Sequence, residues 1–395
     1  MIMDKLGLSD VDVSGQRVLV RVDFNVPMQD GRITDETRIT AALPTLMELI
    51  NRDAKVILVT HLGRPAGRTP KLSTAPVADA LSKRLGRRVA HIGDCIGEAV
   101  QKAVASLEAG DVLLLENVRF YAEETDNDAE FARQLASYAD VYINDAFGTA
   151  HRAHASTEGV THYLNPCAAG LLMAREIYYL STTFNNPERP YIAILGGAKI
   201  SDKITLIGNL LGNVDSLLIG GGMAYTFFAA SGLPVGDSLV ETEKLGVAKS
   251  LIEQDAFANT VLLPLDNVVG REFHADTEIQ IAYSGHIRDG WQGMDIGVQT
   301  VAAFGELIAD AKTIVWNGPL GVYEFERFAQ GTIAIAKHIA ESNAMSIIGG
   351  GDCVAAVQQA SVADKMTHIS TGGGASLEFL EGKPLPGIAA LTDKR

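Results

Sequence analysis

Short apolar runs rich in Val, Ile and Leu recur along the chain and alternate with stretches of helical periodicity. The first half contains RVLVRVDF from Arg17, KVILVTHL from Lys55, DVLLLENV from Asp111 and VYINDAF from Val141. The second half contains YIAILGG from Tyr191, SLLIGGG from Ser216, TVLLPLD from Thr260, TIVWNGP from Thr313, MSIIGGG from Met345 and HISTGGG from His368. Such runs are apolar on both faces, as strands of a parallel sheet covered by helices must be. The pattern therefore predicts an α/β fold.

The segments between the runs include two clear helical patterns. TRITAALPTLMELI, from Thr37, has one apolar stripe and is preceded by Thr34 or Asp35 as a cap, although Pro44 weakens this helix. AAGLLMAREIYYLSTTF, from Ala168, ends in the polar, proline-bearing sequence NNPERP, which stops a helix. At roughly 150 residues per domain, the 395 residues favour two or three domains. We place a domain connection at this second helix.

Composition and charge narrow the class of protein. The chain is 47% hydrophobic, and its 33 Lys+Arg against 48 Asp+Glu leave a formal charge of −15, so no broad basic surface is available for nucleic acid. Its three cysteines form no CxxC pair, which fits a reducing cytosol. The amino terminus does not have the pattern of a signal peptide. The uncharged stretch 216–236 contains several glycines and Pro234, which favours a strand, a turn and a helix over a membrane span.

Polar residues follow the apolar runs of the first half. They come where ligands bind in open parallel sheets, beyond the carboxyl ends of the strands. They are Asp23, Asn25, His61, Arg64, Arg119, His151 and Arg152, with Arg38 at the start of the first helix. Several guanidinium groups at one crevice of an acidic protein predict a site for a small anion bearing phosphate or carboxylate groups. The alternative is a set of solvated surface arginines.

The histidines of these segments admit two interpretations. His61 and His151 have the residue type for acid–base chemistry, but we favour a role in shaping the pocket. The segment 142–154 (YINDAFGTAHRAH) does not have the spacing of a zinc-protease helix, so we predict no metal site there.

Glycines, in contrast, follow the runs of the second half, in clusters that begin at Gly196, Gly220, Gly349 and Gly372. Glycine lets backbone N–H groups approach a phosphate, and a helix that starts next adds its positive dipole end. The clusters therefore predict a nucleotide site, unless they only make tight turns.

The signatures of the common nucleotide-binding families are missing, because the sequence contains no GxxxxGK[ST], no HRD or DFG pair and no GxGxxG. Lys199 and Lys203 are one helical turn apart and are placed to face a polyphosphate together. Asp352 follows three glycines and is placed to hold the Mg²⁺ that accompanies a nucleotide.

Taken together, these residues belong to segments that strongly resemble phosphoglycerate kinases over essentially the full length. The segments are RVDFNVP from Arg21, HLGRP from His61, ENVRF from Glu116, DAFGTAHRAH from Asp145, LGGAKISDKI from Leu195, WNGPLGVYE from Trp316, IIGGGD from Ile347 and STGGGAS from Ser370. The resemblance implies two doubly wound, Rossmann-like α/β domains joined by a hinge. It also implies a reversible glycolytic and gluconeogenic transfer of the acyl phosphate of 1,3-bisphosphoglycerate to ADP, which gives 3-phosphoglycerate and ATP.

The resemblance also implies an organisation along the chain. It assigns residues 1–170 to the 3-phosphoglycerate-binding domain, 171–190 to the interdomain helix and hinge, and 191–378 to the Mg-nucleotide-binding domain. It returns residues 379–395 to the first domain. By resemblance, the protein is a cytoplasmic monomer that uses Mg²⁺ and binds neither nucleic acid nor membrane.

Site residues carry over by position from the matching motifs. The substrate-binding set is Asp23, Phe24, Asn25, Arg38, His61, Leu62, Gly63, Arg64, Arg119 and Arg152. The nucleotide-binding set is Lys199, Lys203, Gly293, Glu324, Gly350, Gly351, Asp352 and Cys353, with Glu324 expected on the ribose and Asp352 on the metal. The chain departs from the family at Cys353, where a hydroxyl residue is usual, and a thiol is a weaker hydrogen-bond partner.

The chemistry implied by the resemblance needs no general base, because the attacking carboxylate of 3-phosphoglycerate is already ionised at neutral pH. Catalysis then depends on alignment and on charge neutralisation. We expect Arg38, Lys199 and the backbone at Gly350 and Gly373 to act on the migrating phosphoryl group.

Two other functions fit parts of the pattern. One is a different two-domain α/β kinase, or a nucleotide-dependent ligase, that acts on a small acid. The other is a binding protein that closes over a phosphorylated metabolite without catalysis. The pairing of Lys199 and Asp352 with an arginine-rich domain separates the enzymes from the binder, since a pure binder needs no lysine that bridges phosphoryl groups.

Overall fold

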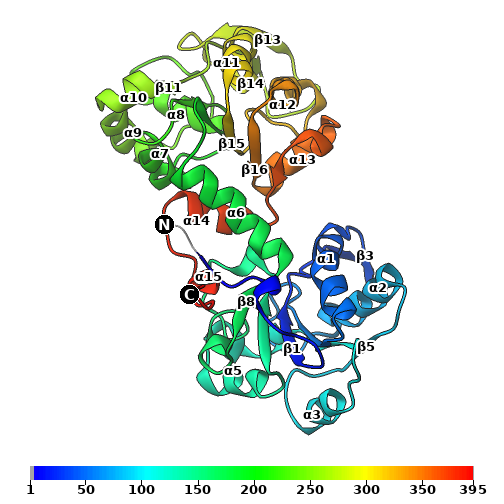
Figure 1. Cartoon of the computed structure of the whole chain (residues 1–395). Helices are drawn as coiled ribbons and strands as arrows, with labels where there is room; N and C mark the ends of the chain where they lie inside the picture. The colour runs from blue at the N-terminus through cyan, green and yellow to red at the C-terminus, as the bar shows by residue number, and fades with distance from the viewer. Residues whose placement is uncertain (1–3, 395) are drawn as a thin grey trace. The chain divides into compact units, whose positions relative to one another are not determined.

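Every one of the apolar runs forms a strand in one of two six-stranded sheets of a computed structural model, which describes residues 4–394 (Figure 1). The strand pairs within both sheets are parallel. The chain divides into two units, Met1–Ser181 with Lys383–Arg395, and Thr182–Gly382, and each unit holds one sheet. The predicted α/β class is confirmed.

The first unit has the strand order β5-β6-β4-β1-β7-β8. Its strands are β1 (Arg17–Arg21), β4 (Lys55–Val59), β5 (Val89–His91), β6 (Val112–Leu114), β7 (Val141–Asn144) and β8 (Cys167–Ala169), with a hairpin of β2 (Met28–Gln29) and β3 (Arg32–Ile33). Its helices are α1 (Thr37–Asn51), α2 (Ala75–Leu85), α3 (Glu98–Ala105), α4 (Ala122–Thr125), α5 (Ala129–Ala136) and α15 (Pro386–Ala389). The edge strands β5 and β8 correspond to no run rich in Val, Ile and Leu, since their sequences are VAH and CAA.

Helix α1 forms as its apolar stripe predicts and runs through Pro44. Its first N–H groups have no partner within the helix, and the carboxylate of Asp35 accepts the N–H of Thr37 at 2.7 Å. Leu46 and Leu49 are buried in the core that α1 and α2 form with β1 and β4. This packing fixes α1 beside the carboxyl end of β1.

The second unit has the strand order β11-β10-β9-β15-β16-β17. Its strands are β9 (Tyr191–Leu195), β10 (Ser216–Ile219), β11 (Val261–Leu262), β15 (Thr313–Asn317), β16 (Met345–Gly349) and β17 (His368–Ile369). A separate antiparallel sheet, β13-β12-β14, consists of β12 (Asp266–Gly270), β13 (Ile279–Tyr283) and β14 (Gln292–Ile296). The helices are α7 (Ile204–Leu210), α8 (Gly222–Ala230), α9 (Leu245–Ile252), α10 (Asp255–Thr260), α11 (Val298–Asp310), α12 (Gln330–Glu341), α13 (Gly351–Gln359) and α14 (Gly373–Leu380).

Helices α11, α12 and α13 pack their apolar residues against β9, β15 and β16, with Trp316 fully buried in this core. The stretch 216–236 forms β10 and α8, as its glycines indicated. No helix within residues 4–394 is long and apolar enough to cross a membrane.

Helix α6 (Leu171–Asn185) is the helix predicted before NNPERP, and the boundary between the two units falls within it. It starts at the end of the first sheet, where Asp145 Oδ1 accepts the N–H groups of Leu172 at 3.0 Å and Met173 at 3.2 Å. This carboxylate therefore caps the helix.

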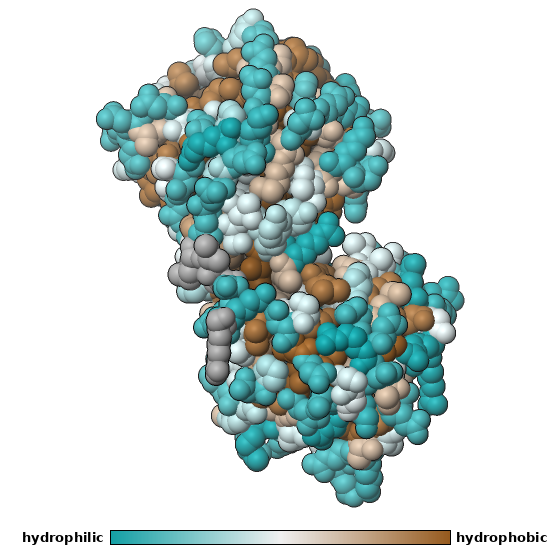
Figure 2. Space-filling view, viewed as in Figure 1, coloured by the Kyte–Doolittle hydropathy of each residue, from teal (hydrophilic) through white to brown (hydrophobic). Residues whose placement is uncertain are grey.

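The carboxyl-terminal segment packs within the first unit, since Asn144 Nδ2 donates to Gly387 O at 3.0 Å and Leu6 N donates to Thr392 O at 2.8 Å. On the face shown in Figure 2, the region of α3 is hydrophilic, and its exposed Lys102 and Glu98 form an ion pair at 2.6 Å.

Candidate active site

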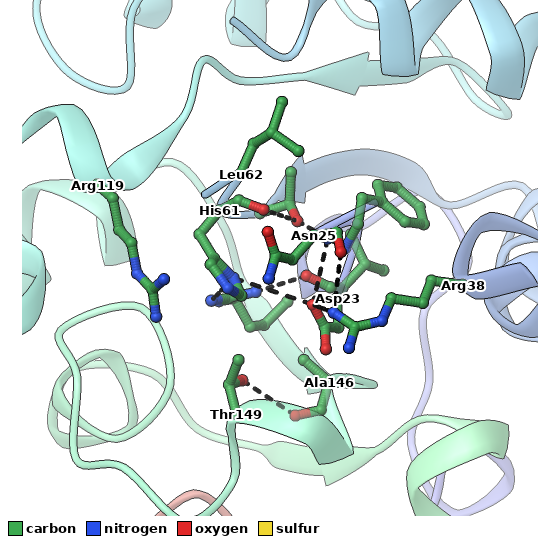
Figure 3. Close-up of polar contacts among 12 residues, drawn as sticks. Asp23, Asn25, Arg38, His61, Leu62, Arg119, Ala146 and Thr149 are labelled. Atoms are coloured by element: carbon green, nitrogen blue, oxygen red, sulfur yellow. Dashed lines mark hydrogen bonds and ion pairs between the residues drawn. The ribbon is translucent and has the colours of Figure 1, made fainter. Parts of the chain in front are cut away.

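The polar residues after β1 and β4 meet at the carboxyl edge of the first sheet (Figure 3). Asp23 Oδ1 accepts from Arg38 Nη1 at 3.1 Å and from the backbone N–H of Asn25 at 3.2 Å. Arg38 Nη1 also donates to Asn25 O at 3.0 Å. Asn25 Oδ1 accepts the N–H of Gly63 at 2.8 Å, which ties the β1 loop to the β4 loop. The structure thus brings together the predicted residues of three segments that are distant in sequence.

A cavity of about 510 Å³ lies beside these loops, and the predicted Arg64, Arg119 and Arg152 are among its lining residues. Arg119 is largely buried, and its Nη1 donates to Gly63 O at 2.8 Å. Within residues 4–394 its Nε has no hydrogen-bond partner. Burial and the neighbouring arginines lower the pKa of Arg119 to about 10, so the group stays charged at neutral pH. The cavity is therefore strongly cationic and suits an anion.

His61 lies between Asp23 and Arg119 in this cluster and is almost completely buried (Figure 3). Burial lowers its pKa well below the usual value, and the nearby Arg21, Arg119 and Arg38 lower it further. The ring is therefore neutral at physiological pH. This state argues against a proton donor of ordinary pKa, and a role of His61 in shaping the pocket stays a prediction, because His61 is not among the residues that line the cavity.

The backbone of the site is held by Asn117, which the sequence analysis did not single out. Its side-chain Oδ1 accepts the N–H of Leu62 at 3.2 Å and that of Arg119 at 3.1 Å, while its Nδ2 donates to Leu62 O at 2.7 Å. One amide thus fixes the loop after β4 to the 3₁₀ turn η3 (Val118–Phe120). The predicted Phe24 and Leu62 have their side chains in the core, so only their backbones face the loops.

Arg21 is a second residue that the sequence analysis missed. It is the last residue of β1 and is fully buried, although it carries a charge. Its Nε donates to Ser156 Oγ at 2.8 Å, and its Nη2 lies 3.2 Å from His61 Nδ1. The available signal was an arginine within an apolar run, since a buried charge requires partners.

In the second unit the glycine clusters follow β9, β10, β16 and β17, whose carboxyl ends share one edge of the sheet. Helices α8, α13 and α14 start within or directly after these clusters. Gly221 and Gly350 have φ angles of 68° and 91°, which favour glycine, and a side chain on Gly221 would approach Gly197 backbone atoms to 2.8 Å. Three helix amino termini therefore lie at one sheet edge, an arrangement suited to phosphate.

The two lysines do not share a helical face, so that interpretation of their spacing is wrong. Both precede α7, which begins at Ile204, because the chain makes a turn there after β9. Lys199 is exposed. Lys203 is buried, and its Nζ donates to Gly196 O at 2.7 Å, Asn317 O at 2.8 Å and Asn317 Oδ1 at 2.6 Å. Burial lowers the pKa of Lys203 to about 8.

The other predicted nucleotide residues lie in three places of the second unit: the start of α13, the turn that follows β15, and β14. Asp352 is exposed in the first turn of α13, and its Oδ1 accepts from Tyr323 Oη at 3.3 Å. Glu324 is exposed in the turn that follows β15. Gly293 lies in β14, where a Cβ atom would clash with the ring of Tyr225, so packing alone explains this glycine.

Cys353 points away from solvent and belongs to the core beneath α13. Its Sγ lies 3.9 Å from Trp316 O, and burial raises the pKa of the thiol. The side chain is therefore a neutral core group, and any ligand contact at this position is limited to the backbone.

Comparisons with known proteins agree with this geometry. A model of the family described as phosphoglycerate kinase matches residues 8–383. The chain is 56% identical to the phosphoglycerate kinase of Moorella thermoacetica over 99% of its own length and 100% of that protein. It is also 56% identical to a cytosolic phosphoglycerate kinase of Triticum aestivum, over 98% of each chain. The solved phosphoglycerate kinase of Coxiella burnetii matches with a TM-score of 0.91 and 42% identity, over 98% of each chain.

The chain belongs to the phosphoglycerate kinase family. The activity of this family, the reversible transfer of a phosphoryl group between 1,3-bisphosphoglycerate and ADP in glycolysis, is accordingly its activity. Its substrates are those of the family, a phosphoglycerate and an adenine nucleotide. Which residues bind each of them remains a prediction from the phosphoglycerate kinase motifs.

Proposed function

We propose that the first unit binds 3-phosphoglycerate or 1,3-bisphosphoglycerate at the carboxyl edge of its sheet. The observation that carries this proposal is the cationic cavity lined by Arg64, Arg119 and Arg152, next to the cluster of Asp23 and Arg38. In a protein of net charge −15, such a cavity selects a small, multiply charged anion. Carboxylate and amide oxygens after β1 suit the substrate hydroxyl group. Gly63 and the backbones of Phe24 and Leu62 hold these loops.

The second unit, in this proposal, binds the nucleotide at its glycine-rich sheet edge. Backbone N–H groups at the starts of α13 and α14, including Gly350, Gly351 and Gly373, donate to phosphate oxygens. Glu324 is exposed in the turn that follows β15, the neighbour of β16 in the sheet, and accepts from the ribose hydroxyls. Gly293 contributes backbone only. This assignment rests on the matching motifs together with the three helix amino termini.

Lys203 has a more specific part in this proposal. Its ammonium group is engaged by three oxygens from the ends of β9 and β15, so it orders both strand ends from within. It reaches a nucleotide phosphate only by exchanging one of these oxygens for a phosphate oxygen. Lys199, which is exposed, is free of that constraint and is the lysine that we assign to the migrating phosphoryl group.

The donor set also fits the magnesium ion that accompanies the nucleotide. Mg²⁺ is usually held by one or two carboxylates together with substrate phosphates and water. Asp352 offers one exposed carboxylate at a helix start, and within residues 4–394 no group of three or more His, Cys, Asp and Glu side chains is arranged to hold a metal alone. When bound, Mg²⁺ neutralises phosphate charge. Asp352 orients the ion and adds no proton chemistry.

The mechanism that follows is one of alignment. The carboxylate of 3-phosphoglycerate is the nucleophile and is ionised at neutral pH, so no side chain has to remove a proton. Transfer requires reacting atoms roughly 3 to 3.5 Å apart. Arg38 and Lys199, with the backbone at Gly350 and Gly373, offset the charge that develops on the phosphoryl group. The neutral His61 shapes the acceptor side without titrating.

We further propose that the protein is a cytoplasmic monomer without nucleic-acid or membrane partners. The acidic charge supports the absence of a nucleic-acid role, and the wheat relative is named as cytosolic.

One assay tests the proposed function. The purified chain is mixed with 1,3-bisphosphoglycerate, ADP and Mg²⁺, and ATP formation is followed by a coupled reaction. We expect one ATP for each 3-phosphoglycerate formed, and reversal in the presence of excess 3-phosphoglycerate and ATP. A folded chain that binds both ligands without forming ATP would show that it is the non-catalytic binder.

A further inference from the structure

The buried arginine at the end of β1 faces His61, which lies between Asp23 and Arg119 in the cluster beside the cavity (Figure 3). Arg21 Nη2 lies 3.2 Å from His61 Nδ1, and both side chains are almost completely buried. The two polar contacts that the described residues give this ring are both at Nδ1, the second being Asp23 Oδ1 at 4.0 Å. The Nε2 edge of the ring is therefore the one left for a ligand.

Arg21 is held in place by a network that reaches into the fold. Its Nε donates to Ser156 Oγ at 2.8 Å, and its Nη1 donates to Val22 O. Ser156 in turn donates from Oγ to Glu124 Oε1 at 2.7 Å and from its backbone N–H to Glu124 Oε2 at 2.9 Å. Glu124 is also fully buried. Ser156 bridges it to Arg21, and the negative charge of the carboxylate balances the positive charge of the guanidinium.

The chemistry of the guanidinium decides the proton position on the ring. Arginine has N–H donors and no acceptor, and it is not deprotonated in proteins. A contact between Arg21 Nη2 and His61 Nδ1 is therefore a hydrogen bond only when Nδ1 carries no proton. Protonation of Nδ1 would place an N–H group against an N–H group in a buried, cationic environment.

We infer that Arg21 is a positioning residue, which fixes His61 as the neutral tautomer with its proton on Nε2 and so presents an N–H donor to the substrate anion. The inference rests on the proposed phosphoglycerate site and adds to it the reason why His61 Nε2 carries the proton that it donates. Arg21 itself is fully buried, so it acts through His61 and not by contact with the ligand. The charged and titratable groups around the ring, which are Arg21, Asp23, Arg38, Arg119 and His154, are together predominantly cationic and agree with a neutral ring.

Nitrogen NMR of the full-length chain, labelled with ¹⁵N in its histidine rings, tests the inference without substrate. In the neutral Nε2–H tautomer the two ring nitrogens have widely separated shifts, with Nδ1 far downfield, whereas the imidazolium has two similar shifts. We expect His61, assigned through His61→Gln, to show the Nε2–H pattern at pH 7.5. An Nδ1–H or imidazolium pattern in the wild-type protein overturns the inference, and this measurement needs no Arg21 variant that folds.

Arg21→Met then tests the role of the arginine. We expect His61 to become a mixture of tautomers and the affinity for 3-phosphoglycerate to fall by the reciprocal of the fraction that keeps the Nε2–H tautomer, which is about twofold for an even mixture. Arg17→Met, at the opposite end of β1, is the control and leaves both unchanged, because its partner is the surface residue Asp140. A folded Arg21→Met protein in which His61 keeps a single Nε2–H pattern contradicts the inference.

Addition of 3-phosphoglycerate to the wild-type protein separates this inference from the proposed function. A shift of the His61 Nε2–H signal supports both. An unchanged Nε2–H signal at a saturating concentration supports the tautomer but contradicts the substrate site at His61.

Discussion

The substitution Arg38→Ala gives a quantitative test of the anion site. Arg38 Nη1 donates to Asp23 Oδ1 at 3.1 Å and to Asn25 O at 3.0 Å, and its side chain is 38% exposed. An ion pair this exposed contributes at most about 1 kcal/mol to folding, so the variant should fold. Removing one cation that faces charge developing in the transition state typically costs about 3 kcal/mol, which corresponds to roughly a hundredfold in kcat.

The assay is steady-state ATP formation at saturating substrates, with circular dichroism and thermal unfolding as the check on folding. Arg17→Ala is the matched control, because Arg17 is 40% exposed and pairs with Asp140 at 2.6 Å, at the start of the same strand. It removes the same charge far from the proposed site, and we expect its kcat to stay within about twofold of wild type. A well-folded Arg38→Ala protein with near-normal kcat would refute the reasoning.

Three further substitutions test other parts of the account. Asp352→Ala should weaken Mg-nucleotide binding in calorimetry by about tenfold or more and leave 3-phosphoglycerate binding unchanged. Asp364→Ala, which removes another exposed carboxylate, is the control, and an equal loss of affinity for both ligands in Asp352→Ala would contradict separate sites. Burial and nearby arginines lower the pKa of His154 from 6.5 to about 4 in the folded protein. The unfolded chain therefore takes up a proton near pH 6.5, before the folded chain does, and the free energy of unfolding should fall by about 3 kcal/mol as the pH drops from 6.5 through 4. Urea unfolding at pH 7 and pH 4.5 should show a smaller loss of unfolding free energy in His154→Gln than in the wild-type protein. An equal loss in the two proteins would contradict the assignment to His154. Gly196→Ala puts a Cβ 2.0 Å from a backbone oxygen and should cost more than about 2 kcal/mol of unfolding free energy, whereas Gly212→Ala, with open space, should cost little; comparable losses would argue against this packing.

Periodicity and apolar runs predicted the α/β class because they report burial, which is a local property of the sequence. Strands buried on both faces must be apolar throughout, and the run from Tyr191 to Leu195 is fully buried as the pattern requires. The same local signal failed for β13, whose edge position leaves Ile281 and Tyr283 exposed. It also gave no indication of β5, whose sequence VAH contains a single Val and no Ile or Leu.

The carboxyl-edge rule placed Asp23, Asn25 and His61 together correctly, since parallel strands bring their ends to one edge whatever lies between them. It did not reveal what holds those residues. The roles of Asn117 and Arg21 depend on hydrogen bonds between segments that are far apart in sequence. No spacing pattern encodes such bonds, because they form only after the sheet has assembled.

For Lys199 and Lys203, the spacing of four residues predicted a shared helical face that the structure does not contain. A separation of four residues puts two side chains on one face only when the segment is helical. Here the glycines after β9 produce a turn, and Lys203 folds inward against the oxygens of Asn317 and Gly196. Where glycines directly precede two lysines four residues apart, the spacing alone therefore does not indicate a helix.

The central claim is that the acceptor and the nucleotide bind on different units, and amide hydrogen exchange with each ligand alone tests it most directly. Amides that hydrogen-bond or lose solvent on ligand binding exchange more slowly. We predict that 3-phosphoglycerate slows exchange in residues 23–25 and 61–64, and that Mg-ADP slows exchange in residues 196–199, 349–352 and 372–374. Protection of the first set by Mg-ADP alone, or of the second set by 3-phosphoglycerate alone, would contradict the account.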